Sequence, residues 1–258
     1  MTVLRAPEQV HDAYVGWNNL GEGATITTDS EAVGFDAANV ADYFTWDFWK
    51  PSTGGTHYIE FQLAAAMPCD YVSVYAQDVH EQGGTVKLQY WNGAAFVDAA
   101  SFVPDNAAPI FLLFNEVISD RFRIEVTAAN PALLGVAMFG KSMIVPHGLK
   151  QGFASPHNAQ LYRDVTNESE TGNFLGRSVR KEAVEFSFGT ELLEYDWFIS
   201  DWRPFLRHAE RKPFFFKWSN TTYTNESVWC WLSNRVSTPA FDDAHFSSIE
   251  IPCKGLVE

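Results

Sequence analysis

The chain is poor in cysteine, with Cys69, Cys230 and Cys253 its three thiols in 258 residues, and no two of them form a CxxC pair. Three thiols cannot all pair within one chain, so a small scaffold held together by disulfides is excluded. Zinc sites of the CxxC type are excluded as well. We expect reduced, packed thiols, as in a cytosolic protein. A Cys230–Cys253 disulfide is the alternative.

Clustered positive charge and long apolar runs are also missing. The chain carries 18 Lys and Arg against 32 Asp and Glu, and residues 1–145 hold 17 of the acidic and 6 of the basic side chains. Phosphate contacts need clustered Lys and Arg, so we expect no specific binding of nucleic acid. No apolar run approaches the ~18 residues of a membrane span, and residues 1–7 lack the pattern of a signal peptide. We therefore expect a soluble protein that folds in the cytoplasm and does not insert into a membrane.

Catalytic and metal-binding motifs are equally scarce. The sequence has no Gly-x-Ser-x-Gly elbow, no phosphate-binding glycine loop, and seven scattered histidines without an HExxH pattern. Asp36, Asn39 and Asp42 could offer oxygen ligands to calcium, but their spacing lacks the density of an EF-hand loop, so turn and capping roles are favoured. We expect neither enzymatic activity nor a cofactor.

Aromatic residues are abundant, at 15% of the chain with 21 Phe and 9 Trp, so a large core is available. The first half reads as short strands of alternating apolar and polar residues, with the turn dipeptide Asn92-Gly93 between two of them. These strands are expected at 58–63, 71–75, 85–91, 95–97, 111–114, 121–126 and 135–140. Alternation without a helix-length periodic stretch indicates an antiparallel sandwich or jelly roll.

The pattern changes near residue 146, where a segment rich in Pro and Gly (146–156) predicts a connection between two domains, 1–145 and 146–258. Polar residues 161–171 predict a loop, and 177–188 a long strand. Thr190 suits a helix N-cap, and apolar spacing predicts a helix over about 190–211. Pro204 interrupts it, so either the helix kinks there or Asp201 caps a second short helix.

Further strands are expected at 214–218, 227–232 and 248–253. The predicted fold class is therefore mainly β: an N-terminal antiparallel β-sandwich followed by a C-terminal β domain with one prominent helix.

The first half resembles the galactose-binding-like (discoidin-type) jelly roll over about residues 17–142. The pieces that carry this resemblance are the loop from Phe35 to Asp42, Thr45-Trp46, the strand from Tyr58 to Leu63, and the strand from Arg121 to Ile124. The resemblance implies a ligand site on loops at one end of the sandwich. Aromatic faces stack on sugars, so Trp49, Tyr43 and Phe44 are candidate glycan contacts. Trp49 is expected to be exposed or packed on a neighbouring subunit, and Trp46 and Trp91 to be core or rim residues.

The second half contains a series of motifs: Gln151-Gly-Phe153, Thr166-Asn-Glu-Ser169, Phe174-Leu-Gly-Arg177, Trp202-x-Pro-Phe205, His208-Ala-Glu-Arg-Lys-Pro-Phe-Phe-Phe-Lys-Trp218 and Trp229-Cys-Trp231. Over nearly all of residues 146–258 it resembles the distal tail or baseplate (tail-tip) proteins of long-tailed, non-contractile bacteriophages. That family implies a structural virion protein without enzymatic activity, assembled in the host cytoplasm. It forms a homo-oligomeric ring, typically a hexamer, between the tail tube protein and the baseplate hub or fibre proteins. DNA passes through the lumen, and host attachment through surface glycans is an option for the N-terminal domain.

A ring subunit must bury apolar surface against identical copies. Successive side chains of a strand point to opposite faces, so Phe214 and Phe216 can pack on the helix while Phe215 fills a neighbour or a second layer. Phe214, Phe215, Phe216 and Trp218 are therefore the candidate assembly interface. The alternative is that all three phenylalanines lie inside one domain. The competing function is a free-standing carbohydrate-binding lectin module.

Overall fold

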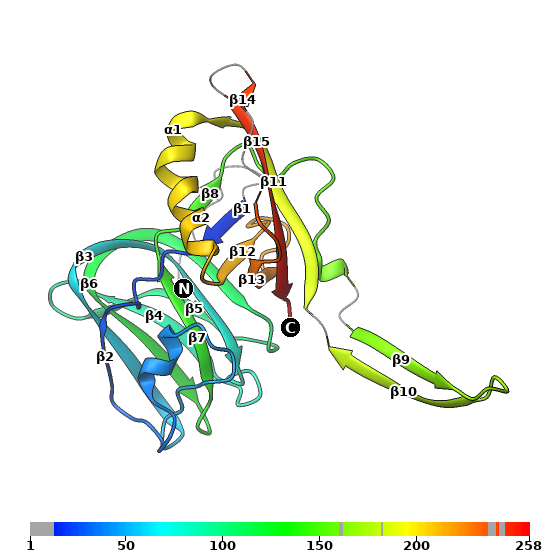
Figure 1. Cartoon of the computed structure of the whole chain (residues 1–258). Helices are drawn as coiled ribbons and strands as arrows, with labels where there is room; N and C mark the ends of the chain where they lie inside the picture. Colours follow the sequence, from blue (N-terminus) through cyan, green and yellow to red (C-terminus); the bar gives the residue numbers. More distant parts are fainter. Residues whose placement is uncertain (1–12, 160–161, 182, 237–240, 243–245) are drawn as a thin grey trace.

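The computed structural model describes all residues except 1–12, 160–161, 182, 237–240 and 243–245. The predicted fold class is confirmed, because the chain is mainly β, with an antiparallel jelly-roll sandwich, a second antiparallel sheet and one prominent helix (Figure 1). None of the helices in the described part of the chain has the length and apolarity to span a bilayer.

The jelly roll is built on two long strands, β3 (Gly55–Gln77) and β6 (Ile110–Ala128), which pair antiparallel over most of their length. The early part of β3 and the late part of β6 belong to a first sheet of order β2-β3-β6-β4-β5. The remaining bounds of this sheet are β2 (Thr25–Thr28), β4 (Thr85–Trp91) and β5 (Phe96–Phe102). Every strand expected in this half falls on an observed strand.

The other ends of β3 and β6 form a second, shorter layer with β7 (Leu134–Gly140), which pairs with β3 from Tyr71 to Gln77. Register shifts between Gln62 and Met67 and between Cys69 and Tyr71 allow the long strands to pass from one layer to the other. Alternate residues of this layer, such as Val72 and Val74, close the core of the jelly roll. The residues between them, such as Tyr71 and Tyr75, face the second domain.

The second domain holds a sheet of order β11-β15-β13-β12-β1-β8, with β14 paired to β15. Its strands are β1 (Ala13–Gly16), β8 (Met143–Val145), β11 (Val184–Glu194), β12 (Phe214–Lys217), β13 (Ser227–Leu232), β14 (Phe241–Asp242) and β15 (Phe246–Leu256). One face of the sheet packs on the helix and the other packs on the short layer of the jelly roll. A sheet covered on both sides explains why consecutive residues of β12 are apolar.

The sequence predicted a division into two domains at residue 145, and the structure divides the chain differently. β1 precedes the jelly roll and β8 follows it, and both belong to the second domain's sheet, where β1 pairs with β12 and with the edge strand β8. The jelly roll is therefore an insertion between neighbouring strands of the second domain, so its entry and exit lie side by side.

The predicted helix is present but begins later than expected. Thr190 does not cap it, because β11 continues to Glu194 and the Thr190 side chain is buried and donates to the Pro146 carbonyl at 2.7 Å. The helix runs through α1 (Tyr195–Trp197), a π-helical turn (Phe198–Trp202) and α2 (Arg203–Ala209). Pro204 lacks an N–H and cannot complete a regular turn, and the helix accommodates it with this wider turn, in which the Arg203 N–H bonds to the Phe198 carbonyl.

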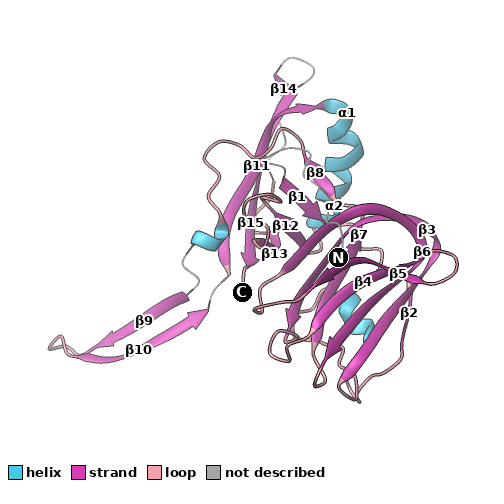
Figure 2. Ribbon diagram, turned by 180° about the vertical axis from the view of Figure 1, so that it is seen from behind, coloured by secondary structure: helices cyan, strands magenta, loops and turns pink. Residues whose placement is uncertain are grey.

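A two-stranded hairpin, β9 (Tyr162–Glu168) and β10 (Phe174–Lys181), projects away from both domains (Figures 1 and 2). The prediction of a loop at 161–171 was wrong for the residues of β9, which form a strand. The single strand predicted at 177–188 is divided between two strands, β10 and β11. Within the described residues the hairpin forms a sheet of its own, and its strands pair only with each other. It follows the short 3-10 helix Pro156–Asn158 and leads directly into β11.

Candidate functional sites

Three phenylalanines proposed from the sequence as an assembly interface lie inside the subunit. Phe214, Phe215 and Phe216 are each 0% exposed. Phe214 and Phe216 pack beneath the helix, where the Phe188 and Phe216 rings stack at 4.2 Å between centroids. Phe215 lies on the other face of the sheet, where its ring is 4.7 Å from that of Trp229 on β13 and 6.5 Å from that of Phe111 in the jelly roll, between centroids. The prediction of a surface for other copies is therefore wrong for these three residues, and the second layer that Phe215 fills is the jelly roll of its own chain.

Trp218 is half-buried and also has partners within its subunit. Its ring stacks on Tyr223 at 4.7 Å between centroids, and its indole N–H donates to Glu226 at 2.7 Å. A role for Trp218 in assembly stays a prediction, but most of its stacking surface is already in use.

The seam between the domains contains a buried lysine. Lys217 is 2% exposed, and its Nζ donates to the Phe111 carbonyl at 2.9 Å and to the Thr224 carbonyl at 2.6 Å. Burial lowers the pKa of Lys217 to about 8. Tyr71 and Tyr75 add polar contacts across the same seam, donating to the main-chain oxygens of Asn18 and Glu258 at 3.0 Å each. The seam thus combines aromatic packing with directed hydrogen bonds.

Tyr43, a predicted glycan contact, faces this seam. Its hydroxyl donates to Glu22 at 2.9 Å and its ring stacks on Trp229 at 6.4 Å between centroids. Burial and the Glu22 carboxylate raise the pKa of Tyr43, while the Lys212 ammonium, which binds Glu22, lowers the pKa of that carboxyl. The backbone of Tyr43 is in the left-handed region, with φ of 70°, which costs some strain in a residue other than glycine. Tyr43 braces the loop that follows.

The braced loop presents two exposed aromatic rings, Phe44 and Trp46. Phe44 is 49% and Trp46 is 68% exposed, and their rings stack at 5.1 Å between centroids with an angle of 26°. The Asp42 carboxylate accepts from the Phe44 N–H at 2.8 Å, and Asn39 donates to Asp47 at 2.8 Å beyond the pair. The assignment of Trp46 to the core or rim was wrong. The polar neighbours Thr45 and Asp47 could have indicated that Trp46 is exposed.

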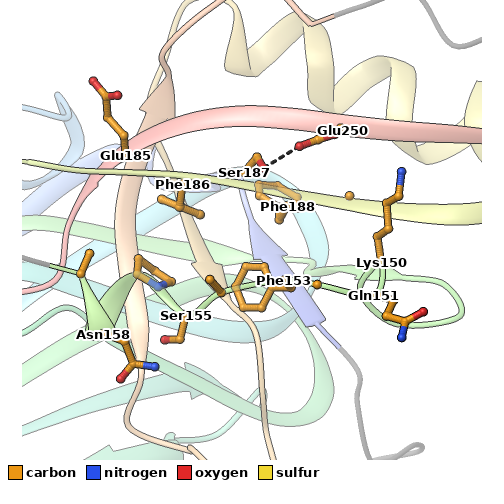
Figure 3. Close-up of a pocket in the computed structure, with 15 residues that line it drawn as sticks. Lys150, Gln151, Phe153, Ser155, Asn158, Glu185, Phe186, Ser187, Phe188 and Glu250 are labelled. Carbon is orange, nitrogen blue, oxygen red and sulfur yellow. Dashed lines mark hydrogen bonds between the residues drawn. The ribbon is translucent and has the colours of Figure 1, made fainter.

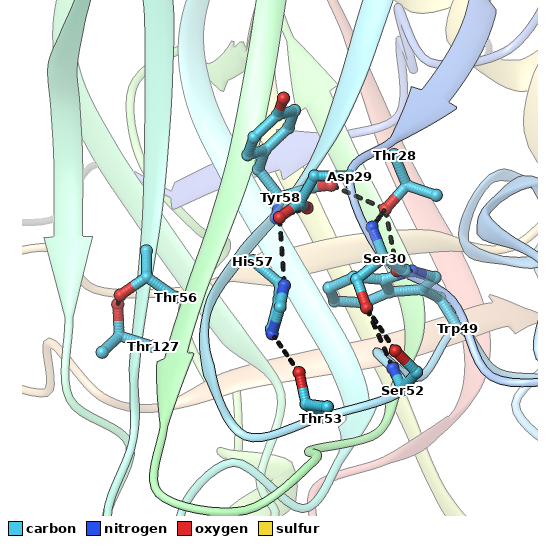
Figure 4. A network of polar contacts seen from close by, with 10 residues as sticks. All are labelled: Thr28, Asp29, Ser30, Trp49, Ser52, Thr53, Thr56, His57, Tyr58 and Thr127. Carbon is cyan, nitrogen blue, oxygen red and sulfur yellow. Dashed lines mark hydrogen bonds and ion pairs between the residues drawn. The ribbon is translucent and has the colours of Figure 1, made fainter.

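Trp49, expected to be exposed or packed on a neighbouring subunit, is 0% exposed within its own domain. It lies under a polar network at the loop end of the jelly roll, where its indole N–H donates to the Ser30 carbonyl at 3.0 Å (Figure 4). In the same network His57 lies between Asp29, 3.0 Å from its Nδ1, and Thr53, 3.2 Å from its Nε2. Trp49 therefore holds the loops from below and offers no ring face to a ligand.

The three residues considered for calcium occupy caps and turns. Asp36 caps the 3-10 helix Ala37–Ala41 by accepting from the Ala38 N–H at 2.9 Å, and Asp42 and Asn39 make the contacts given above. Across the described residues, no group of three or more His, Cys, Asp and Glu side chains is placed to hold a metal ion. Cys69, Cys230 and Cys253 are free thiols buried in the structure, so the Cys230–Cys253 bridge is not formed.

The hairpin tip carries an exposed apolar pair that sequence analysis did not single out as a site. Phe174 and Leu175 are each 66% exposed, and Leu175 lies at a register shift between Phe174 and Gly176. The turn before them is held by the Ser169 N–H donating to the Asn173 carbonyl and the Gly172 N–H donating to the Ser169 carbonyl, both at 2.8 Å. Phe174 and Leu175 belong to the segment Phe174-Leu-Gly-Arg177, which the sequence analysis named among the motifs of the second half.

A cavity of about 430 Å³ lies at the base of the hairpin, between β11 and the segment 150–159 (Figure 3). Its apolar lining is formed by Phe153, Phe186 and Phe188. Lys150 and Glu250 lie at its rim, and Glu250 accepts a hydrogen bond from Ser187 at 2.6 Å. The cavity adjoins an edge strand, because β11 is the last strand of its sheet.

No family model matches the chain, and no curated protein does. Solved structures match about half of it. A GH29 fucosidase from Ruminococcus gnavus in complex with fucose is 19% identical, with a TM-score of 0.43, and the match covers 49% of this chain and 27% of the fucosidase. The chain thus spans about a quarter of the length of that enzyme.

Single carbohydrate-binding modules match over a similar part. A CBM32 module from Clostridium perfringens in complex with GalNAc-β-1,3-galactose is 14% identical, with a TM-score of 0.43, and the match covers 48% of this chain and 100% of the module. A chitosan-binding module from Paenibacillus sp. is 17% identical, with a TM-score of 0.40 and coverage of 48% and 99%. At these scores the likeness supplies no argument about what this chain binds or does.

Proposed function

We propose that this protein is a non-enzymatic structural subunit of a bacteriophage tail tip. It assembles with copies of itself into a ring, typically a hexamer, that joins the tail tube protein to the baseplate hub or fibre proteins. It folds in the host cytoplasm and ends in the virion. The motifs of residues 146–258 suggest the setting, and the projecting hairpin is the observation that carries the proposal.

An isolated two-stranded hairpin is at best marginally stable in water. In the part of the chain that the structure describes, β9 and β10 pair only with each other. The side chains described at their tip, from Thr166 to Glu168 and from Asn173 to Leu175, are exposed. A hairpin of this kind gains stability when it packs on another surface, and the two domains of its own chain do not provide one. Another subunit is the simplest source of that surface.

The buried aromatics support the same conclusion by elimination. Because the helix and the jelly roll cover the two faces of the second domain's sheet, these faces are closed to other subunits. In the second domain, backbone groups and exposed side chains remain available for contacts between subunits at the hairpin and at the sheet edges.

The test is the oligomeric state of the full chain, measured by native mass spectrometry alone and with its tail tube and hub partners. A variant in which a short Gly-Ser link replaces residues 162–181 should fold with an unchanged near-ultraviolet circular dichroism spectrum of the aromatic core and yet fail to form the ring. Ring formation by this variant would refute the proposal, and so would a wild-type protein that stays monomeric with both partners present.

A second candidate function, glycan binding by the jelly roll, is favoured by the exposed pair of Phe44 and Trp46. Stacked rings on a braced loop suit the C–H faces of a neutral sugar, and the neighbouring carboxylates of Asp42 and Asp47 can accept bonds from sugar hydroxyls. On a glycan array, Trp46→Ala should abolish any binding that wild type shows, while Val33→Ala, at a fully exposed loop position, should leave it unchanged. Binding that survives Trp46→Ala would exclude this site.

A further inference from the structure

The cavity at the base of the hairpin and the apolar pair at its tip are separated by one hairpin length. The cavity is lined by residues just before β9 and just after β10, including Asn158 and Glu185. β9 has seven residues, which at ~3.3 Å each place the tip roughly 23 Å from the base. An extended hairpin therefore carries its tip away from the cavity of its own subunit.

The cavity has the features of a receptor for apolar side chains. Phe153, Phe186 and Phe188 form its lining, and about 430 Å³ of space lies among them (Figure 3). Beside the cavity lies the outer edge of β11. In the described residues, this edge makes one backbone hydrogen bond, which the Lys150 N–H donates to the Gly189 carbonyl at 2.8 Å. Further along this edge, at Glu185 and Ser187, backbone groups remain available to an added strand.

The tip has the complementary features. Phe174 and Leu175 expose two-thirds of their surface each. Leu175 is the extra residue at the register shift, so it lies outside the regular pairing of β9 with β10. Glu168 and Glu170 make the tip acidic. The cavity carries no net positive charge in return, because Glu185 and Glu250 line it together with Lys150, which is paired with Glu191. The two surfaces therefore match through their apolar side chains and not through charge.

We propose that the cavity beside β11 receives Phe174 and Leu175 from the hairpin of a second copy of this chain. This inference rests on the proposed function and specifies which surfaces meet. Each subunit then carries one donor and one acceptor, about one hairpin length apart. A contact between two different surfaces of identical chains repeats head to tail, and it closes into a ring when the rotation per subunit allows.

Two variants test this arrangement. Phe174→Asp with Leu175→Asp removes the donor, and Ala154→Trp fills the acceptor from an exposed position on the cavity wall. Each variant alone should be monomeric by native mass spectrometry under conditions in which wild type assembles. A one-to-one mixture should give dimers and nothing larger. The Asp variant keeps an intact cavity and the Trp variant keeps an intact hairpin tip, so each pair of chains can form one contact. Asn158→Trp is a second acceptor variant, and Ala94→Trp, in a turn of the jelly roll, is the matched control.

Cross-linking gives an independent measurement. Chains carrying Leu175→Cys are mixed with chains carrying Ala154→Cys and treated with a short bismaleimide. The three native thiols are buried and therefore do not react with it. Covalent dimers should form between the two kinds of chain and be lost with Ala94→Cys in place of Ala154→Cys. Normal assembly of both Trp-filled variants, with the Asp variant monomeric, would overturn this inference and leave the proposed function standing. Assembly that survives the Asp variant and removal of the hairpin would refute both.

Discussion

The buried Lys217 leads to a specific prediction about the dependence of stability on pH. Its side chain is 2% exposed and its ammonium is held by two neutral carbonyl oxygens, from Phe111 and Thr224. Burial disfavours the charged form and lowers the pKa from 10.5 to about 8. Replacement by methionine keeps the length and apolar stem of the side chain but removes the titrating group.

The sign follows from proton binding in the two states. Between pH 8 and 10.5 the unfolded chain keeps a proton on this lysine that the folded chain has released, so the lysine's contribution to the free energy of unfolding rises with pH. That contribution is present in full above pH 10.5 and is lost as the pH falls through 8. A shift from 10.5 to about 8 corresponds to roughly 3 kcal/mol, at 1.36 kcal/mol per pH unit.

The assay is urea unfolding, followed by tryptophan fluorescence, of wild type and Lys217→Met at several pH values from 7 to 10.5. The wild-type free energy of unfolding minus that of the variant should rise by about 2 to 3 kcal/mol across this range. Tyrosines and thiols that titrate in the same range are present in both proteins and cancel in the difference. Lys254→Met, at a partly exposed position of β15 where the side chain forms a surface ion pair with Glu185, is the control and should stay within about 0.5 kcal/mol of wild type. A flat difference for Lys217→Met would show that its ammonium is hydrated and would refute the reasoning.

Three further predictions concern the core and the seam. Phe215→Ala should destabilise the protein by about 3 to 5 kcal/mol in urea unfolding, because it leaves a cavity between the sheet and the jelly roll. Gly16→Ala should lower the melting temperature, because a Cβ there would lie 2.6 Å from the Tyr71 ring. Burial raises the pKa of the Cys69 and Cys230 thiols, so a thiol reagent at pH 8 should label them only when the protein unfolds. Rapid labelling of the native protein would contradict their burial.

The strands of the jelly roll could be predicted from the sequence because each has one face in a core and one face outside it. In β3, Ile59 and Phe61 point into the jelly roll while Tyr58 and Glu60 do not, and this produces the alternation that predicts a strand. The same rule fails where a sheet is covered on both sides. In β12 it could assign Phe214 and Phe216 to a common face, but it could not say that the cover over Phe215 is another part of the same chain.

Exposure of single residues was harder to predict than strands. Trp49 is followed by the polar loop of Lys50 and Pro51, yet its side chain points inward because its indole N–H reaches the Ser30 carbonyl. Trp46, three residues earlier, is exposed. The sequence places both in one loop, and only the packing of that loop on β7, through the pairing of Trp49 with Leu134, decides which ring is covered.

The hairpin was missed for a reason that bears on its role. Patterns of apolar residues arise from packing against the core of the same chain, and the hairpin of β9 and β10 projects away from both domains (Figures 1 and 2). A strand whose partner surface lies on another molecule has no need of that pattern, so polar residues such as Thr166 to Glu168 resembled a loop. In the proposed assembly, the exposed Phe174 and Leu175 mark the point where an apolar contact is needed. If head-to-tail docking satisfies this need, the variants of the tip and of the cavity must fail alone and complement each other in a mixture.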